Sequence, residues 1–409
     1  MLFALINVTA VVVSVLVAIP VVTLLVEVLA ASITSNRAAG PIGSDARANA
    51  AVIVPAHNES EGLRPTLIEI GSQLRNGDRL VVVADNCTDD TAAIAAAVGA
   101  EVVERCDPER IGKGFALDAG VLHLCATPPG VVIIIDADCR LSAGTIDRLA
   151  ATCSASGRPV QALDLMISPD RVSLNYSVAE FAWRLKNWVR PLGLARLGLP
   201  CQLMGTGMAF PWPVIRDANL ATGHIVEDMR LGLELSAANR APLFCPDAVV
   251  TSEFPLSAQG AVTQRQRWEY GHLQFIRDAA LPMLWQALRQ GNPGLAALVL
   301  DICVPPVALL VLLATAMLSI SVLATLLNES VLPFAFAASV FAALVFAVAL
   351  AWARCGRDVL PFSSVMHILP YLGGKLLLYL RLARSGPNVG WIRTDRSTGK
   401  RITGRRSGG

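Results

Sequence analysis

Three long apolar stretches limit what this chain can fold into. The first occupies residues 2–31, and the others occupy 295–327 and 331–353. A helix needs about 20 predominantly apolar residues to cross the hydrocarbon core of a bilayer. Each stretch is long enough, although Glu27 and Asp301 place carboxylates inside two of them. We therefore predict membrane-spanning helices near both ends of the chain, with Asp301 turned toward the bundle or a polar path.

Basic residues predict the orientation of these segments. No Lys or Arg precedes Arg37, which disfavours a cleaved signal peptide and favours a retained anchor. Arg37 and Arg47 follow the first stretch, and Arg354 and Arg357 follow the last one. Because Lys and Arg are enriched on the cytoplasmic side of a membrane, we expect the segment between the stretches to be cytoplasmic.

Residues 359–382 form a fourth apolar stretch of a different kind. It contains Lys375 and a pair of glycines, and a strongly basic tail follows it. If it crossed the membrane, the tail would lie outside, against the charge rule. We prefer an interfacial or re-entrant helix, and a third spanning helix of the C-terminal block is the alternative.

Composition excludes several other classes. The chain has 409 residues, of which 54% are hydrophobic and 16% charged, whereas ordinary soluble domains carry about 25% charged residues. Its net charge of +2 argues against nucleic acid as the main partner, because binding to a phosphate backbone needs a basic surface. The nine cysteines include no C-x-x-C pair, so they predict neither a zinc site nor a disulfide framework.

Residues 50–290 alternate between short β-branched runs and helical patterns. The expected strands are 51–54, 80–83, 101–103 and 131–135, and the expected helices are 61–74, 91–98, 114–124 and 142–152. Apolar strands separated by helices predict a mainly parallel α/β sheet, with ligands bound beyond the carboxyl ends of its strands. The expected domains are an anchor at 1–35, an α/β domain at 36–290, a membrane block at 291–384 and a tail at 385–409.

Two acids, Asp136 and Asp138, follow the expected strand 131–135 directly. Carboxylates so close together repel each other and lose hydration beside an apolar strand unless a cation is present. Mg²⁺ and Mn²⁺ take oxygen ligands from one or two carboxylates together with substrate phosphates. The pair therefore predicts a divalent metal that holds a diphosphate. The alternative is a solvated turn, which would need no buried strand before it.

Other polar residues are ambiguous when taken singly. Asp85 ends a strand, where it could bind a nucleotide base or cap the next helix. Lys113 lies between two glycines and could approach a phosphate or be a surface lysine, and its surroundings lack the P-loop pattern. The Gly205-Thr206-Gly207 loop suits the close approach of a ligand.

Two later motifs have helical spacing. Glu227 and Asp228 begin a helical pattern, where acids favour the helix dipole or could act as a general base. Gln264, Arg267 and Trp268 share one helical face. An Arg beside a Trp can clamp a diphosphate while the indole receives a sugar ring, and an interfacial Trp with a snorkelling Arg is the alternative.

In this order the residues resemble a membrane-bound family 2 glycosyltransferase of the GT-A fold, the type of the cellulose, chitin, hyaluronan and poly-N-acetylglucosamine synthases. The motifs that carry the resemblance are Pro55-Ala56-His57-Asn58-Glu59, Asp85, Asp136-x-Asp138, Glu227-Asp228 and Gln264-x-x-Arg267-Trp268. The resemblance covers about the whole chain. It implies a Rossmann-like, mainly parallel GT-A domain with transmembrane helices, in a multi-pass protein of the inner (cytoplasmic) membrane with its catalytic domain on the cytoplasmic side.

The resemblance also implies a role for each matching residue. Asp228 would be the catalytic base, with Glu227 beside it, and Asp138 and Asp136 would hold Mg²⁺ or Mn²⁺. The donor would contact Pro55, Glu59, Asp85, Lys113, Asp136, Asp138, Arg267 and the W-x-x-T-x-R residues Trp391, Thr394 and Arg396. The acceptor would contact Gly205, Thr206, Gly207, Gln264 and Trp268.

The implied reaction moves a sugar, with inversion, from a nucleotide-sugar donor to a growing glycan or lipid-linked acceptor. The donor is expected to be UDP-linked and the product an exopolysaccharide or cell-surface glycan. Expected partners are these substrates, membrane lipids and an export or polymerisation protein, because so few spanning helices leave a self-contained polymer channel doubtful. The alternatives are a polyprenyl-phosphate glycosyltransferase, whose relatives lack Gln-x-x-Arg-Trp, and a non-enzymatic membrane scaffold.

Overall fold

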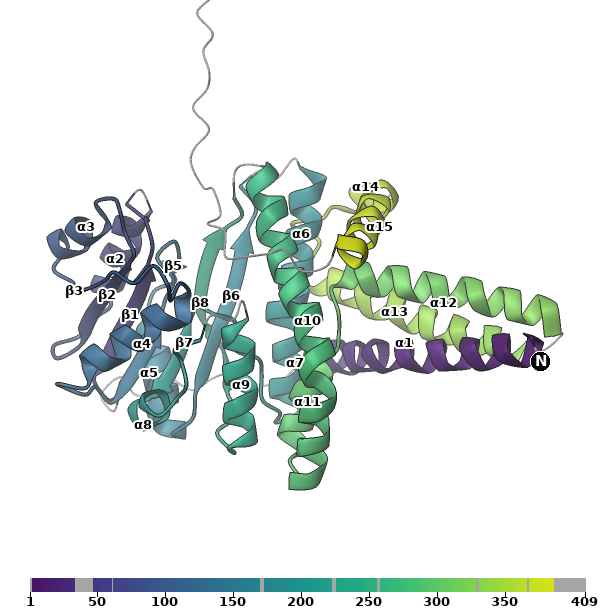
Figure 1. The fold of residues 1–409 in the computed structure, drawn as a ribbon, viewed down its shortest axis with the longest axis horizontal. Helices are drawn as coiled ribbons and strands as arrows, with labels where there is room; N and C mark the ends of the chain where they lie inside the picture. Colours follow the sequence, from purple (N-terminus) through teal and green to yellow (C-terminus); the bar gives the residue numbers. More distant parts are fainter. Residues whose placement is uncertain are drawn as a thin grey trace, which may run out of the picture.

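The computed structural model describes residues 2–33, 47–60, 62–169, 173–222, 226–255, 258–328, 331–365 and 368–385. An α/β domain lies at one end of the molecule, and a bundle of long helices projects from it (Figure 1). Helices α6, α7, α10 and α11 lie between the sheet and the bundle. The expected combination of an α/β domain with membrane-length helices is therefore confirmed.

One eight-stranded sheet, in the order β3-β2-β1-β4-β7-β6-β8-β5, forms the centre of the α/β domain. The strands are β1 (Ala50–Ala56), β2 (Arg79–Asp85), β3 (Glu101–Arg105), β4 (Val131–Ile134), β5 (Arg140–Leu141), β6 (Val160–Ile167), β7 (Met208–Pro211) and β8 (Leu243–Glu253). The first four in this order are parallel, as expected. Strand β7 is antiparallel to both of its neighbours, and β5 is antiparallel to β8.

Helices cover both faces of the sheet, which explains why its central strands are apolar throughout. Along β1, Val52 and Val54 pack into one core, and Ala51 and Ile53 pack into the other. The first core is closed by α2 (Leu63–Gly71), α3 (Thr91–Ala97) and α5 (Thr145–Ser156). The second is closed by α4 (Lys113–Leu124), α8 (Trp212–Arg216) and α9 (Glu227–Ala237). This two-sided burial is typical of a parallel sheet.

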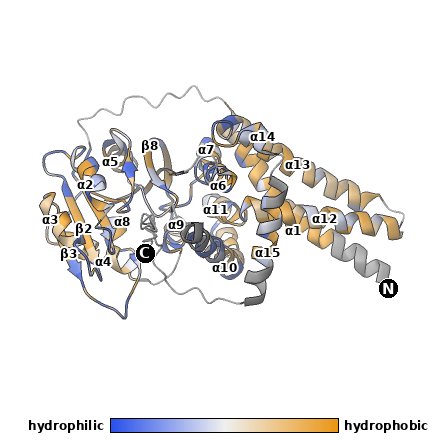
Figure 2. Ribbon diagram, turned by 90° about the horizontal axis from the view of Figure 1, so that it is seen from above, coloured by the Kyte–Doolittle hydropathy of each residue, from blue (hydrophilic) through white to orange (hydrophobic). Residues whose placement is uncertain are grey.

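Three helices of the described chain are long and apolar enough to cross a membrane, at Val11–Ser32, Val307–Leu327 and Leu332–Cys355. They belong to α1 (Leu2–Ser32), α12 (Val307–Asn328) and α13 (Leu332–Cys355), which pack against one another. Figure 2 shows that these helices consist mainly of hydrophobic residues. Their length and composition indicate that the protein is associated with a membrane.

The apolar stretch predicted over 295–327 contains two helices, of which the second is long enough to span a membrane. The segment is divided into α11 (Pro293–Ile302) and α12, with Pro305 and Pro306 between them. Proline lacks a backbone N–H and disfavours helical geometry in the residue before it, so consecutive prolines end the first helix. Helix α11 packs against α9 and α10 (Ala258–Gln290) instead of lying within the bundle.

The predicted stretch 359–382 contains two helices, α14 (Phe362–Val365) and α15 (Ile368–Ser385). Helix α15 lies across the domain-side end of the bundle (Figures 1 and 2). It is not among the described helices that are apolar enough to span. Lys375 on this helix forms an ion pair with Glu269 of α10. These observations agree with an interfacial helix, which stays a prediction.

A buried cluster of charges joins the bundle to the α/β domain. Helices α6 (Leu174–Arg184) and α7 (Arg190–Arg196) are connected by the π-helical turn η2 (Leu185–Val189). Arg190 Nε donates to Glu27 Oε2 on α1 at 3.0 Å, and Arg190 Nη2 donates to Asp301 Oδ1 on α11 at 2.5 Å. All three residues are at most 4% exposed. Asp301 is therefore turned into the protein, and Arg190 is its ion-pair partner.

Helices α1 and α7 lie unusually close together at Gly193. A Cβ atom on this residue would lie only 2.0 Å from the backbone oxygen of Glu27. Glycine therefore permits the contact, which lies one helical turn from the Arg190 ion pair. The same short segment of α7 holds α1 through both a charge and a close backbone approach.

Candidate active site

A cavity of about 510 Å³, named here the transfer cavity, lies beyond the carboxyl ends of β1, β4 and β6. Its lining brings together residues from the segment after β4, the first turns of α4 and α9, the 202–206 loop and α10. Of the predicted site residues, those that line it are Glu59, Lys113, Asp136, Asp138, Gly205, Thr206, Glu227, Asp228, Gln264, Arg267 and Trp268. Motifs that are far apart in sequence thus meet at the edge where a parallel sheet binds ligands.

Asp136 and Lys113 form an ion pair inside the transfer cavity. Lys113 Nζ also donates to the Gly205 carbonyl oxygen at 2.8 Å, and the Asp136 N–H donates to Thr206 Oγ1 at 3.0 Å. Burial acts to lower the pKa of the Lys113 amine, but the neighbouring carboxylates outweigh this effect and raise that pKa. Lys113 is therefore a permanent cation that links α4, the end of β4 and the 202–206 loop.

The residues present fit a divalent cation whose coordination is completed by substrate. Both Asp136 and Asp138 line the transfer cavity, and each offers carboxylate oxygens, the hard ligands that Mg²⁺ and Mn²⁺ prefer. Within the described residues, no group of three or more His, Cys, Asp or Glu is arranged to hold a metal alone. One or two carboxylates with phosphate oxygens is the usual arrangement for Mg²⁺.

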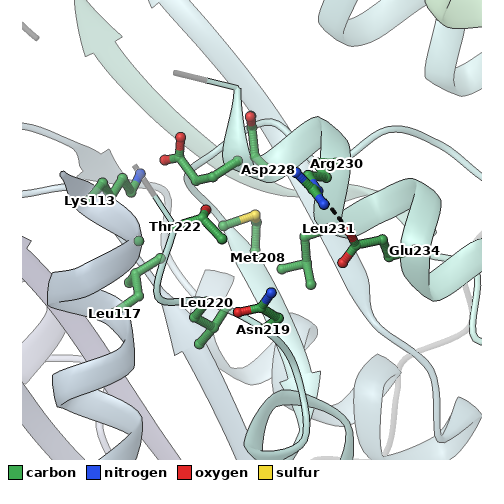
Figure 3. Close-up of a pocket in the computed structure, with 12 residues that line it drawn as sticks. Lys113, Leu117, Met208, Asn219, Leu220, Thr222, Asp228, Arg230, Leu231 and Glu234 are labelled. Atoms are coloured by element: carbon green, nitrogen blue, oxygen red, sulfur yellow. Dashed lines mark hydrogen bonds and ion pairs between the residues drawn. The ribbon is translucent and has the colours of Figure 1, made fainter. Parts of the chain in front are cut away.

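Glu227 and Asp228 form an acidic pair in the first turn of α9, across the cavity from Lys113. Figure 3 shows Lys113 and Asp228 on facing elements around an adjoining small pocket. Burial raises the pKa of both carboxyls, and repulsion by Asp228 helps to raise the pKa of Glu227 to about 7. A carboxyl that titrates near neutrality is suited to general acid–base work.

Gln264, Arg267 and Trp268 line the transfer cavity from α10, as their helical spacing predicts. Gln264 is buried, with 4% of its surface exposed. The Trp268 ring packs against Trp183 of α6 with their centroids 5.0 Å apart. The pair presents an aromatic surface to the cavity, on which a sugar ring or an apolar group can pack.

Several predicted residues lie outside the transfer cavity. Asp85 is buried and accepts from Arg105 Nη1 at 2.6 Å, and Pro55 is half-buried on β1. Gly207 has a φ of +66°, and a Cβ on it would lie 2.7 Å from Ala162 Cβ, so it serves close packing of the loop on β6. The tail residues Trp391, Thr394 and Arg396 lie outside the described residues.

Residues that were not singled out in the sequence also line the transfer cavity, among them Asp164, Lys186, Asn187 and His272. Burial raises the pKa of the Asp164 carboxyl to about 8 and lowers the pKa of His272 to about 3. His272 Nε2 lies 2.8 Å from the Ile302 carbonyl oxygen. Asp164 lies within strand β6, between Leu163 and Leu165, and an acid inside a largely apolar strand is the signal that could have found it. Lys186 and Asn187 lie in the π-helical turn, for which the sequence carries no comparable signal.

The mainly parallel sheet, with an acidic pair beyond β4 and a second acidic pair at the start of α9, is the arrangement expected of a GT-A glycosyltransferase. A family model described as "Glycosyltransferase like family 2" matches residues 48–271. The chain belongs to this family.

Known proteins resemble parts of the chain. Uncharacterized glycosyltransferases of Mycobacterium tuberculosis and Mycobacterium bovis are 44% identical to it over 100 residues, which is 24% of this chain. The match spans only 41% of the length of these curated relatives.

Solved structures are also similar, at lower sequence identity. A mannosyltransferase of Pyrobaculum calidifontis, in complex with GDP-Man and Mn²⁺, is 18% identical with a TM-score of 0.49, covering 85% of this chain and 99% of the other. A glucosyl-3-phosphoglycerate synthase of Mycobacterium tuberculosis, in complex with Mn²⁺, UDP and glucosyl-3-phosphoglycerate, is 21% identical with a TM-score of 0.35, covering 58% of this chain and 84% of the other.

Proposed function

We propose that this glycosyltransferase moves a sugar, with inversion, from a UDP-linked donor to a hydroxyl group of a glycan or lipid-linked acceptor. The observation that carries the proposal is the convergence of Asp136, Asp138 and Asp228 on one cavity, with Lys113 between them. One acidic pair is suited to the donor diphosphate and the other to proton transfer. The product would be a cell-surface glycan or exopolysaccharide.

The positions of these groups support the following reaction. Asp228 accepts the proton of the acceptor hydroxyl, and the hydroxyl oxygen attacks the anomeric carbon from the face opposite the diphosphate. The bond between the anomeric carbon and the diphosphate oxygen breaks as the new bond forms. Arg267 and Lys113 line the same cavity and stabilise the charge that develops on the departing nucleoside diphosphate.

Asp138, with Asp136, would hold Mg²⁺ or Mn²⁺ together with the donor. When bound, such an ion would supply positive charge to the diphosphate. Asp136 is already neutralised by Lys113, so we assign the larger share of metal binding to Asp138. Asp85, Pro55, Glu59 and the tail residues remain proposed donor contacts.

We further propose that the α/β domain faces the cytoplasm of a multi-pass inner-membrane protein. The charge pattern around the membrane segments supports this orientation. Nucleotide sugars would then reach the transfer cavity directly from the cytosol. An export or polymerisation protein is the expected partner for any long product.

A donor panel tests the proposed reaction. Purified protein in lipid nanodiscs would be incubated with Mn²⁺ and with UDP-, GDP- or dTDP-linked sugars, and release of each nucleoside diphosphate would be measured. Turnover restricted to UDP-sugars is expected. Turnover only with GDP-sugars would refute the assignment of uracil as the nucleobase of the donor. The Asp228→Asn variant should bind UDP as the wild type does and release far less of it.

The two alternative functions, a polyprenyl-phosphate transferase and a non-enzymatic scaffold, predict different behaviour of the variants. A polyprenyl-phosphate transferase needs no general base for its anionic acceptor, so Asp228→Asn would retain turnover with that lipid. A non-enzymatic scaffold would retain its cellular function in both Asp138→Ala and Asp228→Asn. The presence of both acidic pairs within one cavity supports the enzyme over the scaffold.

A further inference from the structure

A second cavity, named here the membrane-side pocket, adjoins the transfer cavity. Its volume is about 130 Å³. The residues that line both cavities are Trp183, Lys186, Gln264, Trp268 and His272. Two of the predicted acceptor residues, Gln264 and Trp268, therefore lie where the cavities meet.

Part of the membrane-side pocket belongs to elements near the membrane boundary: Ala182 of α6, Val307 and Ala308 of α12 and Tyr371 of α15. The charged residues Arg190 and Glu269 also line it. Val307 is the first residue of the spanning segment Val307–Leu327. The pocket therefore lies between the site of sugar transfer and the level at which hydrocarbon begins, and most of its lining is apolar.

The two cavities differ in polarity. Asp164 and Asn187 line the transfer cavity, and the Oδ1 atom of each is buried without a hydrogen-bond partner. Unpartnered buried oxygens of this kind are costly and match the hydroxyl donors of a ligand. Asn187 lies in the π-helical turn η2, a local geometry that is frequent at functional sites. A ligand that fills both cavities would have a hydroxylated end and an apolar end.

Charge around Glu227 and Asp228 favours a neutral acceptor over an anionic one. Of the cations that line the cavity, Lys113 and Arg267 are assigned to the donor diphosphate. Lys113 is already paired with Asp136. A phosphate group at the acceptor position would meet Glu227 and Asp228 as like charges, whereas a hydroxyl can donate its proton to them.

The helix bundle is packed by side chains. Val21, Leu24, Met317 and Leu344 lie in its core and are at most 1% exposed. Within the described helices, a core filled in this way leaves no conduit for a hydrated glycan chain. An amphiphile that enters from the side of the bundle needs no such conduit.

We propose that the acceptor is a membrane lipid with a free hydroxyl, whose polar end lies in the transfer cavity and whose apolar end lies in the membrane-side pocket. This inference rests on the proposed transferase function. The lipid hydroxyl forms a bond to the anomeric carbon, its proton moves to Asp228, and the nucleoside diphosphate leaves with the electron pair of the broken bond. The product is a neutral glycolipid with one added sugar.

The experiment measures lipid labelling and nucleotide binding in parallel. Wild-type protein in nanodiscs would receive Mn²⁺, radiolabelled UDP-sugars and one of four probes: dioleoylglycerol, a monohexosyl dioleoylglycerol, undecaprenyl phosphate or a soluble β-linked oligosaccharide. Binding of UDP would be followed by calorimetry. Label in an organic-soluble, mild-acid-stable product of either hydroxyl lipid is expected.

Variants connect the labelling to the membrane-side pocket. Ala308→Trp fills the pocket from α12, and Ala182→Leu reduces it more gently from α6. Both should lower lipid glycosylation by about ten-fold or more, because an occupied pocket excludes the apolar end, while UDP binding stays unchanged. Ala316→Trp is the matched control, since Ala316 lies on the same helix and is exposed; it should retain wild-type transfer.

The results distinguish failure of the lipid-acceptor proposal from failure of the proposed transferase function. Label only in undecaprenyl phosphate, only in the soluble oligosaccharide or in none of the probes would overturn the hydroxyl-lipid acceptor if UDP still binds. Undiminished transfer by both pocket variants would also overturn it. A wild-type protein that neither binds nor turns over any nucleotide sugar would overturn the proposed function itself.

Discussion

Glu27 and Arg190 are 163 residues apart in the chain, and Arg190 Nε donates to Glu27 Oε2 at 3.0 Å in a site that excludes water. Arg190 also pairs with Asp301 at 2.5 Å. Arg190→Met would leave two buried carboxylates without their cation. We expect this change to destabilise the protein by about 3–5 kcal/mol, measured as a lower midpoint of thermal unfolding in detergent.

The control for this prediction is an ion pair at the surface. Arg230 Nε lies 2.7 Å from Glu234 Oε1, with both side chains more than 40% exposed. Arg230→Met should change the unfolding free energy by no more than about 1 kcal/mol, because solvent screens the pair. Equal effects of the two substitutions would show that the buried cluster does not hold the bundle to the domain.

Asp228→Asn should separate chemistry from binding. The amide keeps the shape of the side chain but cannot accept the hydroxyl proton, so we expect kcat to fall by about 10²–10⁴-fold. The dissociation constant for UDP with Mn²⁺ should stay within about three-fold of the wild type, a change of less than 1 kcal/mol. Glu227→Gln provides the comparison, and a greater loss of kcat in that variant would transfer the role of base to Glu227.

The rate should depend on pH through the acidic pair. Burial raises the pKa of both carboxyls, that of Glu227 to about 7, whereas Lys113 and Lys186 act to lower the pKa of Asp228. A base works only when deprotonated, so kcat should fall as the pH drops through the raised pKa of Asp228. In Lys186→Met a charge that lowers this pKa is gone, so the acidic limb of the kcat profile should move to higher pH. An unmoved limb would contradict the electrostatic contact between Lys186 and Asp228.

Asp138→Ala should abolish metal-dependent binding of the donor. The variant retains Asp136, but the Lys113 ion pair already occupies that carboxylate. Titration of UDP by calorimetry, with and without Mn²⁺, would give the same weak affinity under both conditions. Asp247→Ala is a suitable control, because Asp247 is exposed on β8 and lies outside the cavity lining. Metal-dependent binding of UDP that survives in Asp138→Ala would show that Asp138 does not hold the metal.

Gly207→Ala should weaken the loop that carries Thr206. Gly207 has a φ of +66°, and an added Cβ would lie 2.7 Å from Ala162 Cβ and 3.1 Å from Val250 Cγ2. Strain and overpacking each cost about 1–3 kcal/mol. A lower unfolding midpoint and a raised KM are expected. Gly77→Ala has a comparable φ of +89° with open space around its Cβ, so it isolates the contribution of the backbone strain.

The sequence was most informative where a local pattern has a direct structural meaning. The run from Val131 to Ile135 followed by Asp136-x-Asp138 predicted both a buried strand and the acidic edge beyond it, because parallel strands end at a common ligand-binding edge. The helical spacing of Gln264, Arg267 and Trp268 predicted a shared face, and all three line the transfer cavity. The apolar stretches likewise predicted spanning helices.

Long-range pairing could not be predicted in the same way. Glu27 and Asp301 stood out as carboxylates in apolar runs, but nothing in either run indicates that Arg190 is their common partner. The Lys113–Asp136 ion pair and the π-helical turn with Lys186 depend on how separate elements pack. The break before α12 could be read from Pro305 and Pro306, yet the hydrophobicity of the flanking residues concealed it.

The contact between Gly193 and Glu27 has a consequence for which substrates can be reached. Because α7 touches the backbone of a spanning helix at a fixed level, the α/β domain cannot slide along α1 without losing both the close approach and the Arg190 ion pair. The anomeric carbon is then presented at one constant height above the bilayer. We therefore expect the enzyme to select acceptors by the length of their headgroup. A hydroxyl group that lies too deep in the membrane, or too far from it, would not reach Asp228.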